Sequence, residues 1–177
     1  MPIIRPSRDA DTPAIAAIYA HHVLNGTGTF EIEPPGVADM AIRRSDVLER
    51  GLPHLVAEVD REVVGFAYCN WFKPRPAYRF SAEDSIYLAP QAQGAGLGRA
   101  LLAELMLRAQ ATGLRKLVAV IVDSNNAGSI GLHRSAGFTE VGLLRSCGWK
   151  FGQWLDVVLM ERSLGLGDLA PPRSIQP

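Results

Sequence analysis

Two spacings of apolar residues along the chain predict its regular elements. Apolar side chains three or four residues apart share one face of a helix, whereas alternating or continuous apolar runs rich in Val and Ile are typical of strands. The first pattern predicts helices over residues 9–25, 37–50 and 125–137, and one after the glycine-rich segment 94–98 with the stripe Leu101, Leu102, Leu105 and Met106. The second predicts strands over residues 2–5, 52–60, 62–72, 83–89, 115–123, 138–146 and 154–162.

Cap and turn residues indicate how these elements are joined. Asp11 stands shortly before Pro13 and is the expected N-cap of the first helix. The turn at 60–61 separates two strands, which predicts an antiparallel hairpin. Helices that alternate with strands around such a hairpin indicate an α/β fold. We expect one domain over residues 1–164 and a disordered tail over 165–177.

The composition argues against several classes of function. The chain has 177 residues with 18 basic and 18 acidic side chains, so no overall field favours nucleic acid or an anionic membrane, and neither is an expected partner. The charged N-terminus is unlike a signal peptide, and no uncharged apolar run approaches the roughly 18 residues of a membrane span, which predicts a cytoplasmic protein. Cys69 and Cys147 lack metal-site spacing, so we expect buried free thiols and no metal.

Residues 91–104, QAQGAGLGRALLAE, place three glycines at alternate positions directly before a helix. Glycine lets a backbone approach a ligand closely, and the free N–H groups of a helix N-terminus favour an anion, so this segment predicts a phosphate site. A Walker A loop and a dinucleotide fingerprint both need a glycine where the chain has Arg99 or Leu101. The pattern that remains is Q-x-x-G-x-G over residues 93–98, with a plain glycine-rich turn as the alternative.

Four segments resemble the Gcn5-related N-acetyltransferases (GNAT), and among these the phosphinothricin acetyltransferase type. They are the glycine loop, which resembles the family's pyrophosphate loop, NNAGSIGLHRSAGF (125–138), KPRPAYRFSAEDSIYL (73–88) and GWKFGQWLDVVLM (148–160). Methionine sulfoximine and methionine sulfone acetyltransferases share most of this frame, but not the KPRPAY type of loop. The resemblance implies a mixed, mostly antiparallel central sheet flanked by helices, acetyl-CoA as co-substrate, a small-molecule amine as acceptor, and a homodimer.

Acetyl transfer to an amine needs a base, because amines with a pKa of about 8 to 10 are mostly protonated at neutral pH. Glu83 matches the family's catalytic glutamate, with a solvated carboxylate as the alternative and Asp84, on the other face of the strand, as the less favoured base. His133, seven residues after Asn126, matches a family histidine that protonates the leaving thiolate or positions substrate; a purely structural histidine is the alternative. The resemblance also implies that an amide near Leu88 stabilises the oxyanion.

The resemblance assigns further residues to the two ligands. The expected contacts to acetyl-CoA are Ile86, Tyr87, Leu88, Gln93, Gly94, Ala95, Gly96, Leu97, Gly98, Arg99, Asn126 and Ser129, with an ordinary helix cap as the alternative for Asn126. The expected contacts to the acceptor are Phe30, Lys73, Arg75, Tyr78 and Ser85. Phe30 could equally be a core residue, and the cationic loop a solvated turn. An open-groove protein acetyltransferase and a non-catalytic acyl-CoA sensor are the rival functions.

Overall fold

The computed structural model describes residues 2–172. Within this range a seven-stranded sheet has the order β1-β2-β3-β4-β5-β7-β6, and adjacent strands are antiparallel except for the parallel pair β4 and β5. The strands are β1 (Ile3–Pro6), β2 (His54–Val59), β3 (Glu62–Trp71), β4 (Ser81–Leu88), β5 (Lys116–Val122), β6 (Thr139–Lys150) and β7 (Gln153–Ser163). The expected mixed, mostly antiparallel sheet is confirmed.

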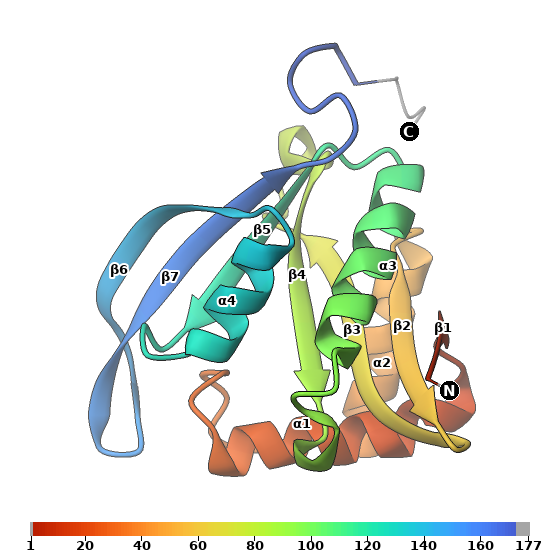
Figure 1. Ribbon diagram of the computed structural model, residues 1–177, viewed down its shortest axis with the longest axis vertical. Coiled ribbons are helices and arrows are strands. Elements are labelled where there is room, and N and C mark those ends of the chain that lie inside the picture. The colour runs from red at the N-terminus through yellow and green to blue at the C-terminus, as the bar shows by residue number, and fades with distance from the viewer. Residues whose placement is uncertain (1, 173–177) are drawn as a thin grey trace.

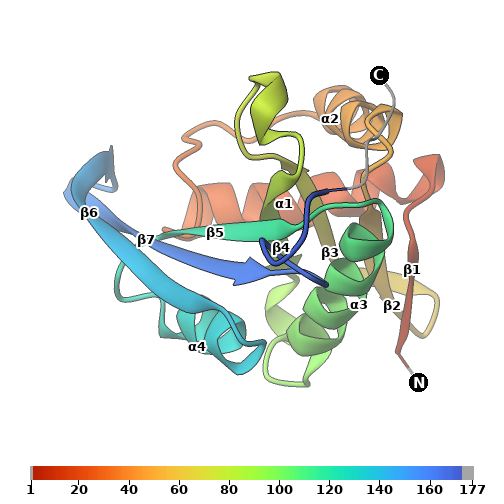
Figure 2. The ribbon, with the colours of Figure 1, turned by 90° about the horizontal axis from the view of Figure 1, so that it is seen from above.

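Helices cover both faces of the sheet. The helices α1 (Thr12–Asn25) and α2 (Val37–Glu49) lie on one face, and α3 (Leu97–Ala111) and α4 (Ala127–Ser135) lie on the other (Figure 2). Short 3-10 turns are η1 (Asp9–Asp11), η2 (Pro76–Tyr78) and η3 (Pro90–Ala92). Leu101, Leu102 and Leu105 of α3 have no exposed surface, which confirms the predicted apolar stripe. In the described part of the chain, no helix is both long and apolar enough to cross a bilayer.

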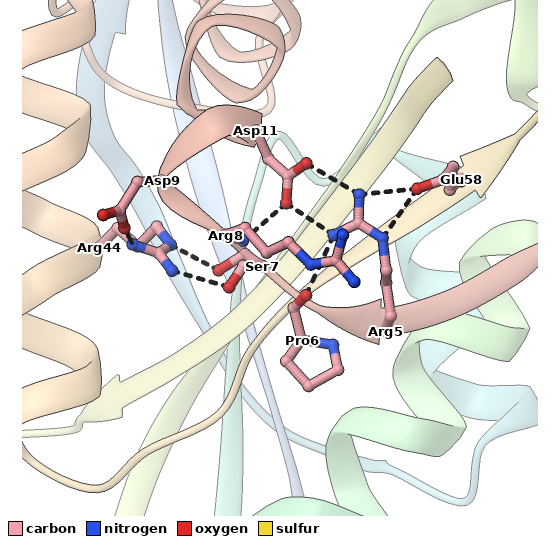
Figure 3. A network of polar contacts seen from close by, with 8 residues as sticks. All are labelled: Arg5, Pro6, Ser7, Arg8, Asp9, Asp11, Arg44 and Glu58. Carbon is pink, nitrogen blue, oxygen red and sulfur yellow. Dashed lines mark hydrogen bonds and ion pairs between the residues drawn. The ribbon is translucent and has the colours of Figure 1, made fainter. Parts of the chain in front are cut away.

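Asp11 does not cap α1 as predicted. Its backbone angles, φ −82° and ψ −15°, are helical, whereas an N-cap residue is extended. The Asp11 carboxylate instead accepts the Arg8 N–H at 2.7 Å and pairs with the Arg5 guanidinium at 2.7 and 2.8 Å (Figure 3). Arg5 also donates to Glu58 of β2 at 2.8 Å, so one arginine joins β1, η1 and β2. This cap prediction was wrong because the side chain has a tertiary partner.

The C-terminal strand pair extends beyond its predicted limits and projects from one side of the molecule (Figure 1). β6 continues to Lys150 instead of ending at residue 146, through an irregular pairing between Leu144 and Gly148. Cys147 lies in this irregular stretch and is exposed, so the predicted burial of its thiol was wrong, whereas Cys69 is buried as predicted.

Residues 165–172 form turns that follow β7. Arg115 donates to the carbonyls of Gly167 and Ala170, at 2.9 and 2.6 Å, and so holds this segment near the start of β5. The remainder of the expected disordered tail, residues 173–177, lies outside the described residues.

Candidate active site

A cleft of about 940 Å³ opens where β4 and β5 diverge. The parallel pairing of these strands ends at Asp84 and Ala119, although β4 continues to Leu88. Because residues of α1 line one side of the cleft and residues of α3 and α4 line the other, two ligands can approach from opposite faces of the sheet. The predicted site residues that line the cleft are Phe30, Glu83, Ser85, Ile86, Tyr87, Leu88, Gln93, Gly94, Gly96, Gly98, Arg99, Asn126, Ser129 and His133.

The glycine loop leaves backbone amides open at the N-terminus of α3. Gly94 and Gly96 have φ values of 78° and 80°, in the left-handed region that favours glycine, and a Cβ at either position would meet no atom within 4 Å. Gly98 packs more closely than the other two glycines. A Cβ added there would lie 3.4 Å from the Leu132 side chain and 3.5 Å from the Leu88 side chain. Open amides at a helix N-terminus bind phosphate groups, so the loop can hold the pyrophosphate of a coenzyme.

The end of β4 turns backbone groups toward the cleft. Ala89 donates its N–H to the Val64 carbonyl of β3 at 2.8 Å, and bonded and non-bonded pairs alternate along antiparallel strands. The N–H and C=O of the preceding residue, Leu88, therefore point away from β3 and toward the opening. His22 of α1 donates to the Leu88 carbonyl from Nε2 at 2.8 Å, so the Leu88 N–H is the backbone group of this residue that faces the opening without that contact.

His22 is not among the residues predicted from the sequence, although two adjacent histidines near the end of an otherwise apolar helix were a signal for it. The ring lines the cleft, and burial lowers the pKa of His22, with the charge of His21 acting in the same direction and the Leu88 carbonyl opposing it. A neutral ring can still donate one N–H, so the contact to Leu88 survives at neutral pH.

Glu83 lies half-buried on β4 at the mouth of the cleft. Asp84, the next residue, meets α4, so the alternation of a strand turns Glu83 toward the face that carries α1 and α2. Burial raises the pKa of Glu83, the negative charge of Asp84 raises it further, and the positive charge of Lys73 lowers it in part. A carboxylate with a raised pKa is a stronger base near neutral pH.

His133 is held at both ring nitrogens. Its Nε2 lies 2.8 Å from Asp84 Oδ2 and its Nδ1 lies 2.7 Å from the Ser129 carbonyl. Burial lowers the pKa of His133, but the hydrogen bond and charge of Asp84, together with the Ser129 carbonyl, outweigh burial and raise it. Asn126 also lines the cleft, and its Oδ1 accepts the Ser129 N–H at 3.1 Å as the N-cap of α4. The cap weighed as the alternative for Asn126 is therefore present.

Phe30 and Ser85 also line the cleft. The Phe30 ring rests against Gly148 of β6, at a place where any Cβ would overlap the ring. Gly148 therefore permits this position of the aromatic side chain. Tyr19 of α1 and Tyr68 of β3 complete an aromatic lining that the sequence analysis did not assign to the site.

Five predicted contact residues do not line the cleft of the described chain. Ala95 is exposed in the glycine loop, and Leu97 is buried in the core, so either could offer only its amide. Lys73, Arg75 and Tyr78 are exposed on the loop before β4. There Phe72 packs against Tyr78, and the Lys73 ammonium lies 4.9 Å from the Phe72 ring centre. Within residues 2–172 no cluster of three or more metal-binding side chains occurs.

Residues 15–138 match the model of the acetyltransferase (GNAT) family. The chain belongs to this family. It is 50% identical over 169 residues to a phosphinothricin N-acetyltransferase of Alcaligenes faecalis, covering 96% of this chain and 86% of that one. It is 39% identical to an L-methionine sulfoximine/L-methionine sulfone acetyltransferase of Pseudomonas aeruginosa, over 95% of this chain and 98% of that one.

Solved structures agree with this assignment. A GNAT superfamily phosphinothricin acetyltransferase from Sinorhizobium meliloti, crystallised in complex with AcCoA, matches with a TM-score of 0.95 and 44% identity over 98% of this chain and 94% of that one. The predicted GNAT fold, the acetyl-CoA-dependent N-acetyltransferase activity and acetyl-CoA as the co-substrate are thereby confirmed.

Proposed function

We propose that the enzyme acetylates the amine of a small amino-acid-like acceptor such as phosphinothricin. The observation that carries this proposal is a single cleft whose lining includes both the glycine loop and the Glu83 carboxylate. Acetyl-CoA would enter along α3 and α4, and the acceptor would enter beside α1, where Phe30 and Ser85 lie. The 50% identity to a phosphinothricin N-acetyltransferase supports this acceptor.

In the proposed reaction Glu83 removes a proton from the ammonium group of the acceptor, directly or through water. The neutral amine then attacks the thioester carbonyl. The Leu88 N–H stabilises the oxyanion that forms, since it faces the opening and its own carbonyl is occupied by His22. Both ring nitrogens of His133 are engaged, by Ser129 and Asp84, so His133 stabilises the departing thiolate through its positive charge. The glycine loop amides hold the pyrophosphate, and Asn126 and Ser129 border the pantetheine path.

Methionine sulfoximine or methionine sulfone is the second candidate acceptor, favoured by the relative of 39% identity. A thiol-release assay with acetyl-CoA and phosphinothricin, methionine sulfoximine, methionine sulfone and unmodified amino acids tests both candidates. We expect the highest kcat/KM for phosphinothricin. No thiol release with any small acceptor would contradict the proposal and favour a protein acceptor or an acyl-CoA sensor.

We propose a homodimer in which the exposed loop residues Lys73, Arg75 and Tyr78 lie near the acceptor site of the assembly. This is supported by the exposed aromatic side chains of the β6–β7 hairpin, since Trp149, Phe151 and Trp154 are 54%, 55% and 62% exposed. Arg75 offers a planar fork that suits a phosphinate or a carboxylate. A cytoplasmic location, and the lack of nucleic-acid and membrane partners, stay predictions from the sequence.

A further inference from the structure

Asp84 and His133 form a buried pair in the wall of the cleft. Asp84 Oδ2 lies 2.8 Å from His133 Nε2, and the two side chains are only 1% and 5% exposed. Phe138 covers the imidazole in an edge-to-face arrangement, with ring centres 5.0 Å apart. The pair therefore has a fixed geometry that faces the reaction space but is shielded from bulk solvent.

The contacts of the pair determine where its protons lie. Nδ1 of His133 is 2.7 Å from the Ser129 carbonyl oxygen, and because a carbonyl only accepts, Nδ1 must carry a hydrogen. In a neutral ring with that tautomer, Nε2 would be a lone pair facing a carboxylate oxygen at 2.8 Å. Two acceptors at this distance repel each other, so one additional proton must lie between Nε2 and Oδ2.

The surroundings of the pair favour keeping this proton. Cys69 of β3 is the register partner of Asp84, and Glu83 is its neighbour on β4; these are the titratable groups next to the carboxylate. Both are acids. Oδ1 of Asp84 is buried with no hydrogen-bond partner, and within residues 2–172 His133 is the only cationic side chain within ion-pair distance of Asp84. Loss of the proton would leave a buried carboxylate without a counter-charge.

We infer that Asp84 is a positioning residue that shares one proton with His133 and so keeps the imidazole positively charged in the wall of the cleft, where this charge stabilises the departing thiolate of coenzyme A. The inference rests on the proposed function for its chemical step. When the C–S bond breaks, the sulfur leaves as a thiolate beside the protonated pair, and the shared proton stays between Nε2 and Oδ2. The thiolate then takes up, through water, the proton that Glu83 removed from the amine, so protons balance over one turnover.

The shared proton is tested without turnover by NMR of the ¹⁵N-histidine-labelled protein. At pH 7.5 we expect both nitrogens of His133 to be protonated, together with a downfield, slowly exchanging proton resonance. The resonance should disappear in Asp84→Asn, whose amide can donate to a neutral Nε2 and so preserve the hydrogen bond and the volume. It should persist in the control Glu83→Gln, which removes the adjacent acid only. An unprotonated Nε2 in the wild-type protein would overturn the inference. This measurement uses the wild-type protein, so it does not depend on whether a variant folds.

The catalytic part is tested by kinetics of the same Asp84→Asn variant. We expect kcat to fall roughly a hundredfold, since a neutral imidazole no longer stabilises the developing thiolate, with calorimetry showing unchanged acetyl-CoA affinity. Wild-type kcat should decrease at alkaline pH as the shared proton is lost, and this decrease should be absent in Asp84→Asn. Unchanged kcat in a variant that has lost the resonance would overturn the role of the charged pair in thiolate departure. Wild-type turnover by Glu83→Gln would instead contradict the proposed function and leave the NMR result untouched.

Discussion

At the scale of single residues, the chemistry depends on side chains whose properties come from distant neighbours. Glu83 is a stronger base because it is half-buried beside the charge of Asp84. The pKa of His133 is raised because the hydrogen bond and charge of Asp84, 49 positions away in the chain, outweigh the effect of burial. His22 contacts Leu88 across 66 positions. Two of these effects give predictions that single substitutions can test.

Glu83→Gln should lower turnover at pH 7 by roughly a hundredfold or more, since glutamine cannot accept the proton of the amine. Steady-state thiol release measures the rate, and calorimetry should find unchanged acetyl-CoA affinity because the glycine loop is untouched. The deficit should shrink as pH rises, because more of the amine then arrives neutral. A deficit that is the same at every pH would remove Glu83 from the role of base.

His133→Gln should change the dependence of stability on pH. The folded state raises the pKa of His133 above its usual value of 6.5, so the stability from its charged form is fully present below about pH 6.5 and is lost as pH rises through the folded-state pKa. The difference in unfolding free energy between wild type and variant should thus be largest in mild acid. Urea titrations from pH 5 to 9 measure it, and a difference that grows with pH would contradict the assignment.

At the scale of elements, glycines decide how closely the loops and strands approach a ligand or a ring. Gly96 precedes α3 with a left-handed backbone and keeps its amide open, whereas Gly148 makes room on β6 for Phe30. Each has a counterpart elsewhere in the chain with a similar backbone but no role in the cleft. These counterparts serve as matched controls.

Gly96→Val should greatly weaken acetyl-CoA binding, because a branched side chain would disfavour the φ of 80° and cover the amides that face the pyrophosphate. Gly51, in the turn after α2, has a φ of 68° and similar open space, so Gly51→Val should carry a comparable strain while binding remains normal. Isothermal titration compares the two folded variants. Equal affinity in both would show that the glycine loop is not the coenzyme site.

Gly148→Ala should displace the Phe30 ring, since the added Cβ would overlap it, at a stability cost of about 1–3 kcal/mol. We expect the KM for the acceptor to rise several-fold and the affinity for acetyl-CoA to change little. Gly142→Ala on the same strand is the control, because its Cβ would make an ordinary contact of 3.9 Å with Leu159. A normal acceptor KM in Gly148→Ala would place Phe30 outside the acceptor site.

At the scale of the whole molecule, the sheet is divided by its one parallel pair among the described strands, and the cleft forms at that division. The hairpin of β6 and β7 extends beyond this frame with its aromatic side chains exposed (Figure 1). Trp149 and Trp154 face each other across the hairpin with ring centres 5.3 Å apart. Such a surface suits contact with a second copy.

Analytical ultracentrifugation should find a dimer for the wild-type protein and a monomer for the double variant Trp149→Ala and Trp154→Ala. Leu107→Ala, on the exposed side of α3, should remain dimeric, because Leu107 is equally exposed, at 65%, but does not belong to the hairpin. If the acceptor site depends on the dimer, the double variant should also lose kcat/KM for the acceptor. A dimer that survives both tryptophan substitutions would exclude the hairpin as the interface.

Local patterns in the chain predict the order of the elements, the glycine loop before α3 and the opposite faces of Glu83 and Asp84, because periodicity, turn preference and strand alternation act over a few residues. The contacts that these residues make depend on the packing of distant segments. Asp11 pairs with Arg5 instead of capping α1. Cys147 is exposed because it lies in an irregular stretch of β6, and the loop that carries Arg75 lies outside the cleft. The contact of Asp84 with His133 depends on which helix crosses which strand on a given face of the sheet. No local pattern carries that information, since the sheet order and the helix positions are set by packing of the whole chain.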